Sequence, residues 1–178
     1  GPDNLVYKAA ALLQDRAECS RGVALHLEKN LPVAAGLAGG SGNAAATLIA
    51  VNTHWDLGWS HADLHALALE LGSDVPYCLT GGTMAATGRG ELLEALPPLP
   101  ETWLVLVHPP LAVTAGHAYG HPQLTRNLEA TDSGKTPAFR RALNHLADGD
   151  LRAMIFNRME SGILIDHPEL AAIKARLI

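Results

Sequence analysis

The sequence predicts an α+β fold, in which strands and helices follow one another without a regular βαβ alternation. Its 178 residues are 48% hydrophobic and 17% charged, a composition typical of a chain that forms an apolar core. Short alternating or apolar runs, which predict strands, are interspersed with longer runs of helical periodicity. This irregular order weighs against a doubly wound parallel sheet.

Two kinds of pattern place the elements of the first hundred residues. Apolar residues at helical spacing predict helices over residues 5–17, from residue 42 or 43 to 54, and over 60–72. Alternation of apolar and polar residues predicts a half-buried strand over 23–28, and another strand is expected over 83–87. Ser60, with Asp63 three positions later, predicts a capping box at the start of the third helix.

Proline and turn residues organise the second half of the chain. The run Pro97-Pro98-Leu99-Pro100 is the clearest linker, because proline stops helices and central strands, and it separates predicted domains 1–96 and 97–178. The continuous apolar run 103–107 predicts a strand covered on both faces. A polar loop is expected over 120–136, followed by helices that begin at 136–137, 151 and 168 and end near 146, 161 and 178.

Charge and cysteine content exclude several classes of partner and compartment. The net charge is -5 and no basic patch stands out, which weighs against nucleic acid or an anionic membrane as the main partner. No stretch is long and apolar enough to span a bilayer, and no signal peptide opens the sequence. Cys19 and Cys78 lie far apart, so we expect free thiols in a reducing cytoplasm rather than a disulfide framework. Nothing in the sequence indicates an oligomeric state.

A glycine-rich loop lies between the strand predicted over 23–28 and the helix that follows it. Its glycines at 36, 39, 40 and 42 let the backbone approach a ligand closely and adopt positive φ where needed. The free N–H groups at the start of the following helix, together with the helix dipole, favour an anion, most often a phosphate. The spacing is not GxGxxG, which weighs against a dinucleotide-binding loop. The alternative is a plain flexible loop.

Asp74 is the acidic residue with the most suggestive context. It follows the helix-ending Gly72 and precedes Val75-Pro76, where we expect an extended chain at the mouth of a turn. One interpretation is a helix cap or an Asx turn. The functional interpretation is a carboxylate that orients or deprotonates a hydroxyl group during phosphoryl transfer.

Three other constellations carry weaker signals. Gly134-Lys135-Thr136 resembles the end of a P-loop, but Glu129 stands where that motif needs glycine. His61 and His65 share a helical face, but a zinc-protease motif needs glutamate where Ala62 stands, so we interpret them as surface histidines. His117 and His121 have the same spacing, with Pro122 after them and no carboxylate near, and we interpret them as loop residues.

Taken together, several ordered segments resemble the GHMP kinase superfamily. The resemblance covers nearly all of the chain, and it rests on the order and spacing of the segments rather than on one of them. It implies a two-lobed α+β fold, with a ribosomal S5 domain 2-like lobe and a ferredoxin-like lobe, and a chain incomplete at both ends. The matching segments are Asp3-Asn4-Leu5-Val6, Lys29-Asn30-Leu31-Pro32, Gly36-Leu37-Ala38-Gly39-Gly40-Ser41, Leu71-Gly72-Ser73-Asp74-Val75-Pro76, Gly88-Arg89-Gly90-Glu91, His108-Pro109, residues 113–119 and His167-Pro168-Glu169-Leu170.

The resemblance also implies an activity and a set of site residues. The activity is ATP-dependent phosphorylation of the 2-hydroxyl of 4-diphosphocytidyl-2-C-methyl-D-erythritol, in the non-mevalonate pathway to isoprenoid precursors. Asp74 matches the catalytic aspartate and Tyr119 an aromatic residue that stacks on the cytosine, while Mg²⁺ bridges the ATP phosphates. No side chain is singled out as a metal ligand. The residues implied to bind ATP are Asn4, Leu5, Lys29, Pro32, Val33, Ala34, Ala35, Gly36, Leu37, Ala38, Gly39, Gly40, Ser41 and Gly42.

Departures from the family pattern leave two alternatives open. Ala35 and Ala38 replace glycines and Gly42 replaces a serine, and we expect a methyl group at Ala38 to crowd a phosphate or to exclude a positive φ. The family's N-terminal Pro-x-x-x-Asn-Leu segment with its catalytic lysine is expected before residue 1, and its C-terminal glycine- and serine-rich loop after Ile178. The alternatives are another GHMP kinase that acts on a different small alcohol, and a non-catalytic nucleotide-binding module.

Overall fold

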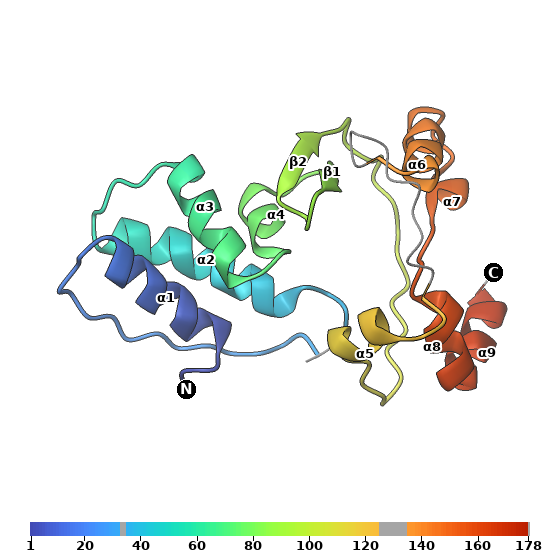
Figure 1. Cartoon of the computed structure of the whole chain (residues 1–178), viewed down its shortest axis with the longest axis horizontal. Helices are drawn as coiled ribbons and strands as arrows, with labels where there is room; N and C mark the ends of the chain where they lie inside the picture. Colours follow the sequence, from blue (N-terminus) through green and yellow to red (C-terminus); the bar gives the residue numbers. More distant parts are fainter. Residues whose placement is uncertain (33–34, 125–134, 178) are drawn as a thin grey trace. The chain divides into compact units, whose positions relative to one another are not determined.

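The computed structural model describes residues 1–32, 35–124 and 135–177 as two compact units, Gly1–Pro109 and Pro110–Ile178 (Figure 1). The first unit contains helices and two strands, and the described part of the second unit contains helices. The fold is therefore α+β, as the sequence predicts. The predicted domain boundary between residues 96 and 97 stays a prediction. The elements of the first unit are helices α1 (Leu5–Arg16), α2 (Gly39–His54), α3 (His61–Leu71) and α4 (Val75–Thr80), and strands β1 (Met84–Thr87) and β2 (Leu92–Ala95).

The core of the first unit is a helical cluster centred on α2, which packs against α1, α3 and α4. Leucine, valine and alanine side chains fill this core, as the scarcity of aromatic residues requires. Small alanine side chains let the helix backbones approach closely, and the leucines fill the space between them. The most deeply buried members are Ala9, Leu13, Ala44, Ala45, Leu48, Val51, Ala68 and Val75.

The helices predicted for this unit are confirmed. The second of them begins at Gly39, earlier than the sequence indicates, so its first turn consists of loop glycines. The capping box of α3 is present: the Ser60 hydroxyl accepts from the Asp63 amide at 3.2 Å, and the Ser60 amide donates to the Asp63 carboxylate at 2.9 Å. Helix α3 ends at Gly72, as predicted.

The backbone before and after Asp74 differs from the expectation. Residues 73–76 are not extended, because α4 begins at Val75 and Pro76 lies in its first turn. Proline is compatible with that position, since the first amides of a helix have no partner within the helix. The preference of the residue before proline for an extended backbone is overridden here by helix packing, with Val75 and Pro76 both buried.

Strands β1 and β2 form an antiparallel hairpin in which Met84 pairs with Ala95 and Thr87 with Leu92. The strand predicted over 83–87 is confirmed. Strand β2 was not anticipated, because its sequence Leu-Leu-Glu-Ala lacks both alternation and β-branched residues. Pairing with β1 across the Gly88–Glu91 turn, rather than intrinsic preference, makes it a strand.

Two predicted strands are wrong. Residues 23–28 and 103–107 carry no strand hydrogen bonding, and in the part of the chain that the structure describes the sheet consists of β1 and β2. The run 103–107 is also exposed rather than covered, with Trp103 98% and Val105 82% accessible. Both patterns have the composition of strands, but a strand also needs a neighbour to pair with, which local sequence does not specify.

The extended segment 22–31 is attached to α2 near Trp55, the residue that follows this helix. The indole N–H of Trp55 donates to the Gly22 carbonyl at 3.3 Å, and the Arg21 guanidinium donates to the Trp55 carbonyl. Trp55 itself is buried, at 3% exposure. These contacts fix the start of the segment beside the C-terminal end of α2.

The second unit is helical in its described residues. Thr136 caps α6 by accepting from the Phe139 amide at 3.2 Å, which confirms the predicted helix start. The helix predicted over 151–161 is two helices, because the Asn157 side chain accepts from the Met159 amide and turns the chain between them. Residues 125–134 of the predicted loop lie outside the described residues. The elements are α5 (Ala115–Gly120), α6 (Pro137–Ala147), α7 (Leu151–Met154), α8 (Glu160–Asp166) and α9 (Pro168–Leu177).

Among these helices, and those of the first unit, none within the described residues has the length and hydropathy needed to cross a membrane.

Candidate functional site

A pocket of about 410 Å³ opens at the N-terminal end of α2. One side comes from the end of the extended segment and the other from the glycine loop and the first turn of α2. Lys29 supplies a positive charge, and the loop supplies mostly backbone. The lining residues are Glu28, Lys29, Asn30, Leu31, Pro32, Ala35, Gly36, Leu37, Ala38, Gly39, Gly40 and Asn43.

The backbone of the loop turns through two residues with positive φ. Gly36 has φ of 70°, which costs glycine little, and nothing lies within 4 Å of the position a Cβ would take there. Ala38 has φ of 49° and ψ of 22°, the left-handed region, immediately before α2. The expectation that a methyl group at Ala38 would exclude a positive φ is therefore wrong. The loop instead holds an alanine in a conformation that L-residues disfavour.

The first turn of α2 leaves its amides available to a ligand. Ala38 occupies the N-cap position and has no side chain able to accept a hydrogen bond. The Gly42 amide already donates to the Ala38 carbonyl at 2.9 Å, so the amides before it in the first turn are the ones without a capping side chain. Such amides, at the positive end of a 16-residue helix dipole, favour a phosphate or another anion.

Leucine side chains pack against this turn. A Cβ on Gly40 would lie 3.4 Å from Leu5 Cδ1, and one on Gly39 would lie 3.6 Å from Leu31 Cδ1. Leu5 and Leu31 therefore lie directly beside the start of α2, close to where the sequence places a nucleotide. Asn4 caps α1, because its Oδ1 accepts from the Val6 amide at 3.0 Å, and its predicted contact with ATP stays a prediction. Val33 and Ala34 of the predicted set lie outside the described residues.

Asp74 lies at the start of α4, exposed, with its carboxylate making no capping hydrogen bond. Asp74 thus occupies the N-cap position, as one interpretation predicts, but its side chain does not make the capping hydrogen bond. Burial raises the pKa of the neighbouring Cys78 thiol, and the negative charge of Asp74 raises this pKa further. Cys78 is consequently protonated at neutral pH, which makes it a weak nucleophile.

The hairpin turn reaches the residue before Asp74. Gly90 has φ of 118°, and a Cβ there would lie 3.0 Å from the Ser73 carbonyl oxygen. Hydrogen bonds from its own amide and from the Arg89 amide lower the pKa of Glu91, whose carboxylate accepts the Arg89 amide at 2.6 Å. Periodicity does not reveal this contact, and the only sequence signal is the Gly88–Glu91 segment that matched the family.

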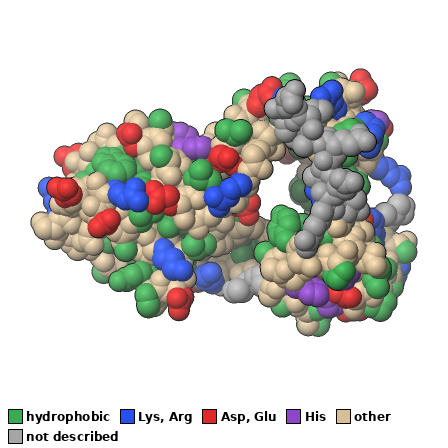
Figure 2. All heavy atoms as spheres, in the orientation of Figure 1, with side chains coloured by type: hydrophobic (Ala, Val, Ile, Leu, Met, Phe, Trp, Pro, Cys, Tyr) green, Lys and Arg blue, Asp and Glu red, His purple; other side chains and the backbone are tan. Residues whose placement is uncertain are grey.

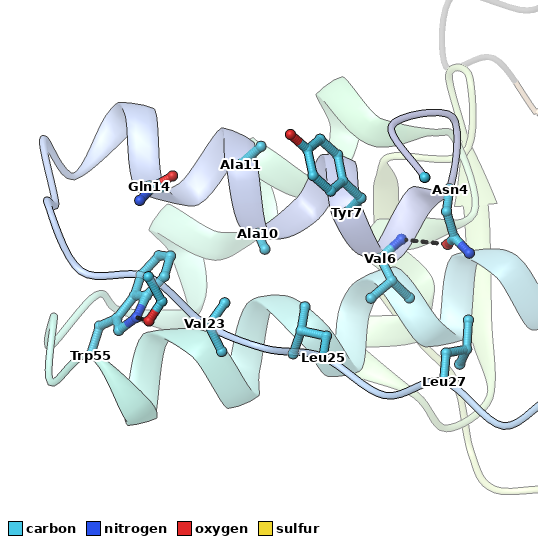
Figure 3. A pocket seen from close by; sticks show the side chains of 12 residues that line it. Asn4, Val6, Tyr7, Ala10, Ala11, Gln14, Val23, Leu25, Leu27 and Trp55 are labelled. Carbon is cyan, nitrogen blue, oxygen red and sulfur yellow. Dashed lines mark hydrogen bonds between the residues drawn. The ribbon is translucent and has the colours of Figure 1, made fainter.

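A second groove, of about 460 Å³, lies between α1 and the extended segment (Figure 3). Tyr7 and Ala11 line it from the helix, and Leu25 and Leu27 from the segment. Its lining contains no Lys or Arg side chain, and the start of α1 that it includes is already capped by Asn4. It therefore lacks the chemistry of the pocket at α2.

The histidine pairs differ from one another. His61 and His65 have ring centroids 6.4 Å apart, and among the described residues no group of three His, Cys, Asp or Glu side chains could hold a metal. His117 and His121 are not loop residues without a carboxylate: His117 lies in α5, and both rings meet Asp166 of α8. The sequence does not indicate this carboxylate as a neighbour, because Asp166 lies 49 residues after His117. Tyr119, the predicted cytosine-stacking residue, also lies in α5, in the second unit, and is 65% exposed.

Comparison with known proteins assigns this arrangement to a class. Residues 4–82, which contain the glycine loop and Asp74, match the family described as GHMP kinases N terminal domain. This part of the chain is therefore similar to the N-terminal domain of the GHMP kinases.

Particular members of that class are similar along nearly the whole chain. The 4-diphosphocytidyl-2-C-methyl-D-erythritol kinase of Heliobacterium modesticaldum is 44% identical over 98% of this chain and 59% of its own length. The enzyme of the same name from Moorella thermoacetica is 45% identical over 100% of this chain and 62% of its own. A crystal structure of 4-(cytidine 5'-diphospho)-2C-methyl-D-erythritol kinase matches with a TM-score of 0.69 and 31% identity, covering 99% of this chain and 62% of that one. The chain thus spans about three fifths of the length of these relatives.

Proposed function

We propose that this chain provides the ATP-binding loop and the catalytic aspartate of a kinase that phosphorylates the 2-hydroxyl of 4-diphosphocytidyl-2-C-methyl-D-erythritol. The names of relatives at 44% and 45% identity support this substrate. The observation that carries the proposal is the uncapped, glycine-lined start of α2, which opens into a pocket with Lys29. This combination suits a polyphosphate better than an apolar ligand.

In this proposal the residues act mainly by positioning and electrostatics, as phosphoryl transfer requires. The first-turn amides of α2 donate hydrogen bonds to phosphate oxygens. The backbone conformation at Ala38 preorganises these amides for the ligand. Lys29 adds positive charge at the pocket's edge. Asp74, which is exposed and whose side chain makes no capping hydrogen bond, orients the substrate hydroxyl and accepts its proton.

Mg²⁺ would neutralise negative charge on the transferred phosphoryl group and its leaving group. Magnesium in such sites is held by one or two carboxylates together with substrate phosphates rather than by a protein cage. The exposed Asp74 carboxylate at the start of α4 is an oxygen donor of that kind. Tyr119 is proposed to stack on the cytosine of the acceptor, as aromatic side chains commonly do with bases.

The test is Asp74→Asn in the full-length protein that carries this chain. ATP affinity, measured by calorimetry, should stay within about twofold, while kcat for ADP release with the cytidyl substrate should fall by about 10²- to 10⁴-fold. Asp56→Asn is a matched control that removes an exposed carboxylate at a left-handed position asparagine tolerates, and it should leave both quantities unchanged.

Each other result points to a specific revision. Unchanged turnover in Asp74→Asn removes this residue from the mechanism. ADP release with small alcohols that lack a cytidine group, at rates equal to those with the cytidyl substrate, identifies a different GHMP kinase. Binding of ATP with no ADP release on any acceptor identifies a nucleotide-binding module without catalysis.

A further inference from the structure

Two histidines and one aspartate link α5 to α8 in the second unit. The Nε2 atoms of His117 and His121 lie 2.9 and 3.3 Å from Oδ2 of Asp166. Figure 2 shows histidine side chains beside an acidic one on the surface over these helices. Burial acts to raise the pKa of Asp166, but the hydrogen bonds from His117 and His121 outweigh it, so the pKa lies below its usual value. The carboxylate is therefore ionised whenever the protein is near neutral pH.

The His121 ring is fixed on its other side as well. Its Nδ1 accepts from the Gln123 amide at 3.1 Å, which makes Nε2 the nitrogen that donates to Asp166. The Ser161 hydroxyl donates to the Gln123 carbonyl at 3.0 Å, tying the same segment to α8 a second time. Gly162 leaves room for the ring, because a Cβ there would overlap the imidazole. His121 is accordingly well buried, with 10% of its side chain exposed.

This linkage sets the direction in which Tyr119 points. Residues two apart on a helix lie on different faces, so the tyrosine is on the side of α5 away from His117. With His117 and His121 held against α8, Tyr119 is turned outward, and the residue is 65% exposed. A short six-residue helix such as α5 has little stability of its own, so tertiary contacts must hold it.

We propose that Asp166 is a positioning residue for the cytidyl substrate, because it holds α5 through His117 and His121 and thereby fixes the orientation of Tyr119. This inference rests on the proposed function, since it assumes that Tyr119 stacks on a cytosine. Asp166 does not itself touch the substrate in this scheme. Substitution of Asp166 should therefore weaken binding of the cytidyl substrate, and only when Tyr119 is present.

A double-mutant cycle on the full-length protein tests the proposal. Tyr119→Ala should raise KM for the cytidyl substrate about 5- to 100-fold, the range expected for loss of base stacking. Asp166→Asn removes the charge that both histidines face and should raise the same KM about threefold or more, with KM for ATP and kcat nearly unchanged. In the Tyr119→Ala background, Asp166→Asn should cause no further rise, because the residue it positions is gone.

The controls separate this proposal from the one it rests on. Asp148→Asn removes an exposed carboxylate at the end of α6 and should leave every constant unchanged. If Tyr119→Ala leaves KM unchanged, the stacking role in the proposed function is wrong. If Tyr119→Ala raises KM but Asp166→Asn does not, or if the two effects multiply independently, only the positioning role is overturned. A fall in Tm for Asp166→Asn with unchanged KM marks a purely structural residue and also overturns it.

Discussion

At the scale of single residues, Ala38 is the clearest case of a side chain in an unfavourable conformation at a site of interest. Its left-handed φ and ψ cost an L-residue roughly 1–2 kcal/mol, and the loop nevertheless keeps them. Because α2 begins at the next residue, this turn sets the direction in which the first amides point. The strain is consistent with a backbone shaped for a ligand rather than for stability alone.

Ala38→Gly should therefore stabilise the protein, by up to about 1 kcal/mol, because relief of the strain exceeds the extra entropy of glycine in the unfolded chain. Urea unfolding of the first unit measures the change. Ala62→Gly is the control, since Ala62 is an exposed position within α3 with a helical backbone, and it should be destabilising. Equal effects of the two substitutions would mean that the φ of Ala38 stores no strain.

Some of the candidate site residues could be predicted from the sequence. The glycine loop and Asp74 were predicted from local context, since turn residues and helix starts act over a few positions. The φ of Ala38 was not, because alanine carries no signal for a left-handed backbone. Nor was the contact of His117 and His121 with Asp166, since 49 residues separate His117 from it along the chain.

At the scale of elements, the capping box of α3 is the best-defined helix start. Hydrogen bonds from the Ser60 hydroxyl and the Ser60 amide lower the pKa of Asp63 below its ordinary value of 3.8. A depressed folded-state pKa means that this group stabilises the fold fully above its unfolded pKa. The contribution is lost as the pH falls through the lower, folded pKa, so it disappears below about pH 4.

Ser60→Ala should lower the free energy of unfolding by about 1 kcal/mol at neutral pH, because it removes the side-chain cap. It should also flatten the loss of stability below about pH 4, since Asp63 then has a less depressed pKa. Denaturant unfolding at several pH values measures both effects. Ser20→Ala, at an exposed position outside the helices, is the control. A parallel pH dependence in Ser60→Ala and the wild type would contradict the role given to Asp63.

Helices were predicted far better than strands. Helices α1, α3, α6 and α9 follow from spacing and caps, which act within a few residues. The runs 23–28 and 103–107 show the opposite case: each has strand-like composition, yet neither pairs with another strand in the described part of the chain. Strand β2 has weak composition and does pair. Strand pairing depends on tertiary structure, so the local pattern predicted two strands that do not form and did not predict one that does.

At the scale of the whole molecule, the run 103–107 is the largest departure from ordinary surface chemistry. Trp103, Leu104 and Val105 are each more than four fifths exposed, and they follow one another on an extended backbone. Exposed apolar segments of this kind bind other apolar surfaces or pair edge to edge.

We expect the 178-residue chain to self-associate with increasing concentration and to enhance the fluorescence of a hydrophobic dye. Leu104→Lys with Leu106→Lys should reduce both, because charge on an extended edge opposes pairing. Light scattering after size exclusion gives the mass at each concentration. Ile155→Lys, at another exposed apolar position, serves as the comparison and should have a smaller effect. Equal reductions would place the association elsewhere.

The attachment of residues 22–31 to α2 has a mechanical consequence. Gly22 is held at Trp55 and Leu31 lies against Gly39, so the segment is fastened near opposite ends of the same helix. Sixteen helical residues span about 24 Å, and the extended segment reaches at most about 30 Å, which leaves it little slack. Deleting three residues of the segment would leave a reach shorter than the helix, too short to join both anchors, so Lys29 would move away from the pocket although the other residues that line it are unchanged.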